Sequence, residues 1–248
     1  MITGPSTGGI GAETAKCLAK ANAKVIILAG RNEAKISPVI QEIGKINPNV
    51  HTKFVKLDLG DLSSVRKAAT EINARVEKID ILINNAGIMA VRKYVATPDG
   101  IESQFGTNHV GHFLLTNLLM SKIMAAGKGA RIVNLSSLGY ELGGVRFDDY
   151  NFEVSHIPKA NTSVEKALSM SYSCPLQDGK AYNPWPAYAQ SKTANILFTV
   201  ALAERLKNKG AQTFAVHPGR MFSSTKSPFS FRTVLTVWFL LVNSHCRE

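Results

Sequence analysis

The sequence predicts a single α/β domain built on a doubly wound parallel sheet. Short apolar runs rich in β-branched residues alternate with stretches of helical periodicity, and a glycine-rich turn follows the first run. Continuous apolar runs are typical of strands that are buried on both faces. Because strand–helix–strand units cross over with one hand, their repetition gives a Rossmann-like sheet with helices on both faces. A chain of 248 residues is long enough to bury such a core.

The first half of the pattern begins with Ile2-Thr3, which resembles the stump of a first strand. A helix is predicted over 10–21, and the apolar run 24–29 predicts the second strand. A helix over 33–46 ends near Asn47-Pro48, since proline disfavours a helical residue before it. A third strand is predicted over 50–57. A helix over 62–76 follows, with Asp61 or Ser63 near its start as the cap.

The second half repeats the alternation. Strands are predicted at 79–83, 131–135 and 212–216, with a long helix within 100–126 and another over 186–209. Residues 1–219 therefore predict one α/β domain, and two segments depart from this alternation.

The first departure is 154–177, a polar insert without periodicity. It is interpreted either as a loop that covers the substrate or as a retained intron translated in frame. The second is the atypical tail 220–248, in which no further helix or strand is predicted. With the short first strand, this tail predicts a domain truncated at both ends and destabilised by an open sheet edge.

Composition narrows the function classes. The net charge is +11, from 29 Lys and Arg against 18 Asp and Glu, which indicates either a solvated basic surface or attraction of an anionic ligand. The sequence contains no basic run with interleaved aromatic residues, which is the pattern that would predict nucleic-acid binding. Three widely spaced cysteines favour a reduced cytoplasmic compartment. No apolar stretch predicts a transmembrane segment, and contact with a membrane surface remains open.

The glycine-rich turn runs from Thr3 to Gly11 and opens a predicted helix. Glycines permit close backbone approach, and the helix N-terminus attracts a pyrophosphate. The turn resembles the TGxxxGxG signature of the short-chain dehydrogenase/reductase family, with one extra residue between Gly4 and Gly9 that the Gly8-Gly9 pair can absorb. The resemblance implies a nicotinamide cofactor bound by Gly4, Ser6, Gly9, Ile10 and Gly11.

The end of the second strand predicts which nicotinamide cofactor is used. Gly30 stands where an acidic residue would bind the ribose 2′-hydroxyl of NAD, and Arg31 follows it. An arginine offers a forked cation to a 2′-phosphate, so NADP(H) is favoured over NAD(H). The alternative is that Arg31 is a solvated loop residue.

Two further motifs extend the family resemblance. Asp58-Leu59, at the end of the third strand, resembles the pair that contacts the adenine ring. Asn84-Asn85-Ala86-Gly87, after the fourth strand, resembles the NNAG motif. By this resemblance, the cofactor is also bound by Asp58, Leu59, Asn85, Ala86 and Gly87.

Tyr188 and Lys192 carry the predicted chemistry. Positions i and i+4 share one helix face, so an ammonium beside the phenol is expected to lower the phenol's pKa and make Tyr188 an acid/base group. Such a pair is common by chance, but here it follows the other motifs in the family's order. The resemblance implies that Lys192 also binds the nicotinamide ribose.

Ser137 is the predicted catalytic serine. The family motif places the catalytic serine second in such a pair after the fifth strand, so the resemblance implies that the Ser137 hydroxyl holds the substrate oxygen; Ser136 is the alternative. Asn108 matches the family asparagine that holds a water in a proton relay to the lysine. His109 and His112, nearby, lack an acidic third ligand, so they predict packing or surface residues rather than a metal site.

His217-Pro218-Gly219 resembles the family's motif beside the nicotinamide, which adds four predicted cofactor contacts: Pro218, Gly219, Met221 and Ser223. The stretches 108–116 and 188–198 resemble the retinol-dehydrogenase-like branch and its fungal relatives. The resemblance implies an oxidoreductase that interconverts a lipophilic alcohol with its aldehyde or ketone, in a family that often forms homo-oligomers. The alternative is a catalytically impaired NADP(H)-binding or interaction protein derived from a truncated or mis-spliced member.

Overall fold

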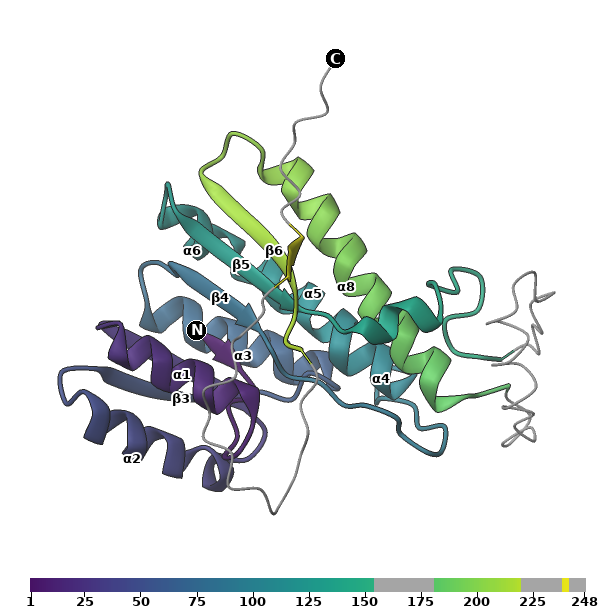
Figure 1. Cartoon of the computed structure of the whole chain (residues 1–248), viewed down its shortest axis with the longest axis horizontal. Coiled ribbons are helices and arrows are strands. Elements are labelled where there is room, and N and C mark those ends of the chain that lie inside the picture. The colour runs from purple at the N-terminus through teal and green to yellow at the C-terminus, as the bar shows by residue number, and fades with distance from the viewer. Residues whose placement is uncertain (154–180, 220–237, 241–248) are drawn as a thin grey trace.

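The computed structural model describes residues 1–153, 181–219 and 238–240, which form one sheet flanked by helices (Figure 1). The strands are β1 (Ile2–Thr3), β2 (Val25–Gly30), β3 (His51–Lys56), β4 (Ile81–Asn84), β5 (Ala130–Leu135), β6 (Ala211–His217) and β7 (Trp238–Leu240). Their order across the sheet is β3-β2-β1-β4-β5-β6-β7, and β1 to β6 are parallel. The predicted doubly wound fold is confirmed.

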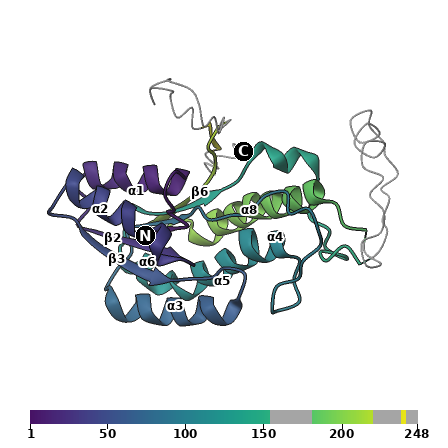
Figure 2. The same cartoon turned by 90° about the horizontal axis from the view of Figure 1, so that it is seen from below.

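The helices cover both faces of the sheet. They are α1 (Ile10–Lys20), α2 (Ser37–Ile46), α3 (Leu62–Arg75), α4 (Ser103–Phe105), α5 (Gly111–Leu118), α6 (Met120–Ala125) and α8 (Pro184–Leu206). Shorter turns are η1 (Glu33–Lys35), η2 (Gly106–Val110) and η3 (Leu138–Leu142). Figure 2 shows α1 and α2 on one face, with α3 and α5 on the other.

The core follows the period-two alternation of the strands. In β2, Ile26 and Leu28 belong to the cluster that packs against α1 and α2. Ile27 and Ala29, which point the other way, belong to the cluster packed against α3, α5 and α8. Successive residues of one buried strand therefore supply two separate cores, which explains its continuous apolar sequence.

The caps follow the local sequence. The carboxylate of Asp61 accepts hydrogen bonds from the main-chain amides of Ser63 and Ser64, so Asp61 is the N-cap of α3. At α8, the side chain of Asn183 accepts from the amide of Trp185, and Pro184 occupies the first helical position. The helix α8 thus begins two residues before the predicted position at 186.

Two predictions about the elements are wrong. The long helix within 100–126 is interrupted by η2, a π-helical turn, and again at Leu119. The tail was expected to contain no strand, but Trp238–Leu240 pairs antiparallel with Ala215–His217 and covers that part of the edge of β6. The insert 154–177 and most of the tail 220–248 lie outside the described residues. No helix among the described residues is long and apolar enough to span a bilayer.

Candidate active site

A cleft of about 420 Å³ opens at the carboxyl ends of the strands, beside the junction of β1 and β4. In doubly wound sheets, ligands bind in this crevice, where the strand order reverses. Its lining includes these predicted site residues: Gly4, Ser6, Ile10, Gly11, Arg31, Asp58, Leu59, Asn85, Ala86, Gly87, Tyr188, Lys192 and Pro218. The cleft thus collects most of the predicted motifs in one place.

Other predicted residues lie elsewhere. Gly9 is the N-cap of α1, and Asn108, Ser137 and Gly219 are not among the lining residues. Met221 and Ser223 lie outside the described residues. The lining includes Ser136, the alternative catalytic serine, in place of Ser137. It also includes residues that were not predicted: Ala29, Gly30, Asn32, Lys35, Leu57, Ile88, Met89, Thr107 and Leu135.

The glycine turn is held by close contacts that exclude side chains. Gly4 has a φ of +65°, and a Cβ there would lie 2.8 Å from the Cβ of Ala86. A Cβ on Gly11 would lie 2.5 Å from the side-chain nitrogen of Asn85. That nitrogen donates to the carbonyl of Thr3 at 2.7 Å. Glycine is therefore required where the turn meets the segment after β4, and the turn retains room for a pyrophosphate.

The two asparagines of Asn84-Asn85 have different partners. Asn84 is buried, and its side chain donates to Asn134 Oδ1 at 2.8 Å and to Thr116 Oγ1 at 3.0 Å. It therefore links β4 to β5 and α5. Asn85 instead braces the glycine turn through the carbonyl of Thr3. Only the second asparagine lines the cleft.

A second cation faces the cleft beside Arg31. Lys35 follows on η1, and its carbonyl accepts hydrogen bonds of 3.1 Å from both the amide and the hydroxyl of Thr7. The glycine turn is therefore tied to the segment that carries both cations. Lys35 was not predicted, and its spacing of four residues from Arg31 is the sequence signal that could have indicated it.

Ser137 and Tyr188 meet above the end of β5. The Tyr188 ring and Ser137 Oγ both approach Gly139, and Ser137 Oγ accepts from the amide of Gly139 at 3.1 Å. A Cβ on Gly139 would come within 2.8 Å of the Tyr188 ring. Ser136 points elsewhere: its hydroxyl donates to the main-chain carbonyl of Lys192 at 3.0 Å and is buried. Of the two serines, Ser137 is the one beside the phenol.

The expected lowering of the Tyr188 pKa by Lys192 is wrong for this structure. Burial raises the pKa of Tyr188, and the hydrogen bond with Ser137 opposes that rise. The Lys192 ammonium donates to the carbonyl of Leu135 at 3.1 Å and lies 5.5 Å from the centre of the Tyr188 ring. Its own pKa is lowered from 10.5 to about 8 because it is buried. Burial is therefore the largest cause of both shifts.

Asn108 lies in the π turn η2, and its side chain hydrogen-bonds the main chain of Ile88 in the segment after β4. Its Oδ1 accepts from the amide of Ile88 at 2.8 Å. Its Nδ2 donates to the carbonyl of Ile88 and to Ser191 Oγ, each at 2.9 Å. A Cβ on Gly87 would lie 3.2 Å from Asn108 Oδ1 and 3.6 Å from Lys192 Nζ. The asparagine and the ammonium therefore approach the same glycine.

The histidines after Asn108 differ from each other. His109 hydrogen-bonds Asn195 and packs among the rings of Phe105, Phe113 and Phe198. His112 is buried and hydrogen-bonded through both ring nitrogens. Within the part of the chain that the structure describes, no three His, Cys, Asp or Glu side chains lie close enough together to hold a metal ion.

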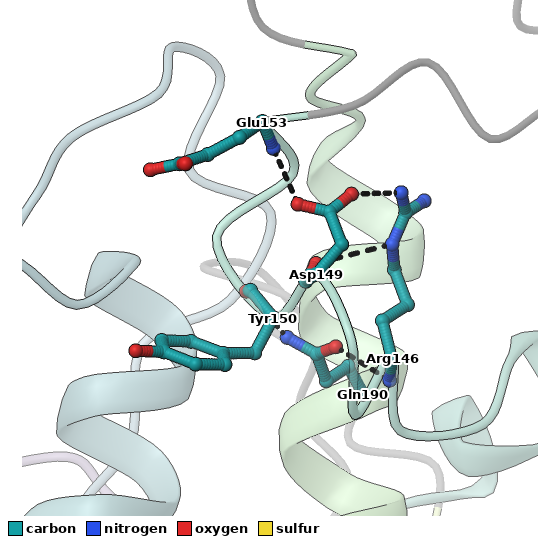
Figure 3. A network of polar contacts seen from close by, with 5 residues as sticks. All are labelled: Arg146, Asp149, Tyr150, Glu153 and Gln190. Atoms are coloured by element: carbon teal, nitrogen blue, oxygen red, sulfur yellow. Dashed lines mark hydrogen bonds and ion pairs between the residues drawn. The ribbon is translucent and has the colours of Figure 1, made fainter.

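Gln190, between the tyrosine and the lysine, anchors a loop to α8 (Figure 3). Its Oε1 accepts from the amide of Arg146 at 3.0 Å, and its Nε2 donates to the carbonyl of Tyr150 at 2.9 Å. Figure 3 shows the guanidinium of Arg146 paired with the carboxylate of Asp149, whose other oxygen accepts from the amide of Glu153 at 2.6 Å. The loop that follows Ser137 is thereby fixed to the helix that carries Tyr188.

Comparison with known proteins agrees with this geometry. Residues 1–151 match the family model of the short chain dehydrogenases. Human retinol dehydrogenase 13 is 39% identical over 98% of this chain and 67% of its own length. The oxidoreductase fscI of Fusarium equiseti is 32% identical over 91% of this chain and 88% of its own length. The chain spans 57 to 68% of the length of the retinol dehydrogenases that it matches.

Solved structures share the fold. A crystal structure of an uncharacterized protein from Mycobacterium Paratuberculosis superposes with a TM-score of 0.66 and 38% identity, covering 88% of this chain and 66% of that one. A metagenomic short-chain oxidoreductase gives a TM-score of 0.61 at 23% identity, covering 88% and 81%. The chain therefore belongs to the short-chain dehydrogenases/reductases, a family of oxidoreductases that act on CH–OH groups, and within it to the retinol-dehydrogenase-like branch.

Proposed function

We propose that this protein uses NADP(H) to interconvert an alcohol and a carbonyl on a lipophilic small molecule, with Ser137, Tyr188, Lys192 and Asn108 as the working residues. The observation that carries the proposal is that the Tyr188 ring and Ser137 Oγ approach the same point beside Gly139, next to a cleft that Tyr188 and Lys192 both line. A phenol and a hydroxyl side by side can both contact one substrate oxygen.

The residues around the cleft suit a phosphorylated dinucleotide. Gly4 and Gly11 let the glycine turn pack closely against Ala86 and Asn85, and the N-terminus of α1 lies at that turn beside the cleft. Arg31 and Lys35 supply two cations at the end of β2, where a preference for NAD would need a carboxylate. This pair supports NADP(H), because a 2′-phosphate is stabilised by charge-assisted hydrogen bonds.

A reduced nicotinamide held beside Tyr188 and Lys192, which line the cleft, would supply the hydride for reduction of a carbonyl carbon. Ser137 donates a hydrogen bond to the carbonyl oxygen, and Tyr188 donates its proton to the same oxygen as charge develops there. The raised pKa of Tyr188 keeps the phenol protonated at neutral pH, which suits an acid. Lys192 resupplies the proton, with Asn108 bracing the turn beside it. The oxidation of an alcohol uses the same contacts in reverse.

The surroundings of Ser137 favour an apolar substrate. Leu138 and Leu142 on η3 expose 47% and 37% of their surfaces, and Met89, which lines the cleft, exposes 61%. Burying such side chains against a substrate is favourable in proportion to the apolar area removed from water. Relatives named retinol dehydrogenases make retinal a first compound to test.

The test is a spectrophotometric screen of NADPH oxidation with retinal, other aldehydes and ketones. We expect substrate-dependent oxidation that Tyr188→Phe abolishes while NADPH binding, measured by fluorescence, is retained. Tyr150→Phe is the matched control, because it removes a hydroxyl from an exposed tyrosine whose ring and carbonyl contacts remain. NADPH binding without turnover of any compound would favour the non-catalytic alternative. Undiminished turnover by Tyr188→Phe would refute the role of Tyr188.

A further inference from the structure

His112 occupies a buried position between the start of the glycine turn, at Thr3, and the π turn η2. It lies on α5 with 2% of its surface exposed. Its Nε2 is 2.9 Å from Thr3 Oγ1, at the end of β1, and its Nδ1 is 2.9 Å from the main-chain carbonyl of Asn108. One imidazole therefore spans the distance between the first strand and the turn that carries Asn108.

The partners of Thr3 determine which ring nitrogen carries the proton. Thr3 Oγ1 accepts hydrogen bonds of 3.0 Å from the main-chain amides of Asn85 and Ala86. Because a hydroxyl has two acceptor sites and one proton, both acceptor sites are taken and only the proton remains. Nε2 of His112, at 2.9 Å, lies much nearer to the hydroxyl than the other acceptor, the carbonyl of Ile83 at 3.5 Å, so the hydroxyl donates to Nε2. Nε2 is then an acceptor, and the ring proton lies on Nδ1, where it can reach the carbonyl of Asn108. The neutral Nδ1–H tautomer satisfies all of these contacts together.

The protonation state agrees with this assignment. Complete burial lowers the pKa of His112 to about 4, and the nearby positive charge of Lys192 and the ring of His109 act in the same direction. The hydrogen bond to the Asn108 carbonyl opposes the change. The ring is thus neutral near pH 7 and can accept from Thr3.

We propose that His112 is a positioning residue. It fixes the π turn η2, which carries Asn108, relative to the glycine turn and to the helix α8. This inference rests on the proposed function. With its carbonyl fixed by His112, Asn108 directs its side chain to Ile88 and to Ser191, the residue that precedes Lys192. Ser191 in turn donates to the carbonyl of Tyr188 at 2.7 Å. Hydrogen bonds therefore connect Thr3 to His112, His112 to Asn108, and Asn108, through Ser191, to the main chain at Tyr188.

Two variants separate the donor from the bulk of the ring. Leucine and asparagine both branch at Cγ, but only asparagine places a nitrogen donor where Nδ1 stands. We expect His112→Leu to lower kcat on the order of tenfold, because a small misplacement of reacting groups is costly, and to change the dissociation constant of NADPH little. His112→Asn should recover most of the lost kcat. Equal kcat for the two variants, or a wild-type kcat for His112→Leu, would overturn the proposal.

A spectroscopic measurement keeps the proposal testable if the variants do not fold or the enzyme has no measurable turnover. A long-range ¹H–¹⁵N spectrum of wild-type protein labelled with ¹⁵N-histidine distinguishes the two tautomers without substrate. We expect the signals missing from the His112→Asn spectrum to be those of an Nδ1–H ring; if that variant is insoluble, His112→Gln supplies the assignment. An Nε2–H ring or an imidazolium at pH 7 would refute the role of His112, whereas failure of the substrate screen alone would count only against the proposed function.

Discussion

The hydroxyl of Ser136 donates a 3.0 Å hydrogen bond to the main-chain carbonyl of Lys192, so the first of two consecutive serines secures the catalytic helix. The second, Ser137, meets the phenol of Tyr188 instead. Successive side chains of an extended strand point to opposite sides, and the end of β5 uses this alternation to separate two roles. A single serine could not serve both.

This division predicts different losses of kcat for two alanine substitutions. Ser136→Ala removes a side-chain donor from a carbonyl inside α8, so we expect a loss of about 0.5–1.5 kcal/mol in the free energy of unfolding and only a small loss of kcat. Ser137→Ala removes the cap of η3, so we expect a similar loss of stability, but it should lower kcat on the order of 100-fold. Urea denaturation and steady-state kinetics measure both. The reverse pattern would assign the substrate oxygen to Ser136.

The cations Arg31 and Lys35 predict cofactor preference. Replacing either by alanine should raise the dissociation constant of NADPH about tenfold or more, since each removes a charge-assisted contact, and should leave that of NADH nearly unchanged. Lys20→Ala, on the exposed end of α1, is the control for a lost positive charge away from the cleft. Equal weakening of NADH and NADPH binding by Arg31→Ala would show that Arg31 does not contact a 2′-phosphate.

Two helical glycines predict opposite changes in melting temperature. A Cβ on Gly111 would lie 2.2 Å from the carbonyl oxygen of Leu59, so Gly111→Ala forces α5 away from a residue of the cleft. We expect a loss of about 1–3 kcal/mol from overpacking. Gly44, on α2, has open space around it, and Gly44→Ala should add about 0.5–1 kcal/mol. Thermal denaturation of both variants checks the pair, and a stabilised Gly111→Ala would contradict the close approach.

The buried Lys192 predicts a pH-dependent stability. In the folded protein its pKa is lowered from 10.5 to about 8, so between these values the unfolded chain binds the proton and the folded chain does not. Stability contributed by this group therefore rises with pH across that window and is constant below it. The unfolding free energy of the wild type relative to Lys192→Met should increase above about pH 8. A difference independent of pH would mean that the ammonium titrates normally.

The sequence was sufficient where local pattern decides structure. The run 24–29 predicts β2 to within one residue at each end, and the Asp61 cap of α3 was among the two expected. The motif residues converge on the cleft because parallel strands direct all of their carboxyl ends to one edge. These features depend on residues close together in the chain.

The features that were missed depend on contacts between distant residues. The π turn forms where Asn108 grips Ile88 and Ser191, and no periodicity within 100–126 reports those partners. β7 exists only through its pairing with β6. Helical spacing correctly puts Lys192 near Tyr188, but it does not reveal that the carbonyl of Leu135 takes the ammonium. The sign of the shift in the Tyr188 pKa therefore could not be read from the spacing.

The shortness of β1 has a mechanical consequence. β1 forms two residue pairs with β2, Ile2 with Leu28 and Thr3 with Ala29. It forms one pair with β4, Ile2 with Ile83. By comparison, β2 and β3 share six pairs. Few residue pairs therefore join the half of the sheet that ends beside Arg31 to the half that packs against α8, the helix of Lys192. A dinucleotide bound across the cleft would contact both halves, so its binding would stabilise the sheet against separation at β1.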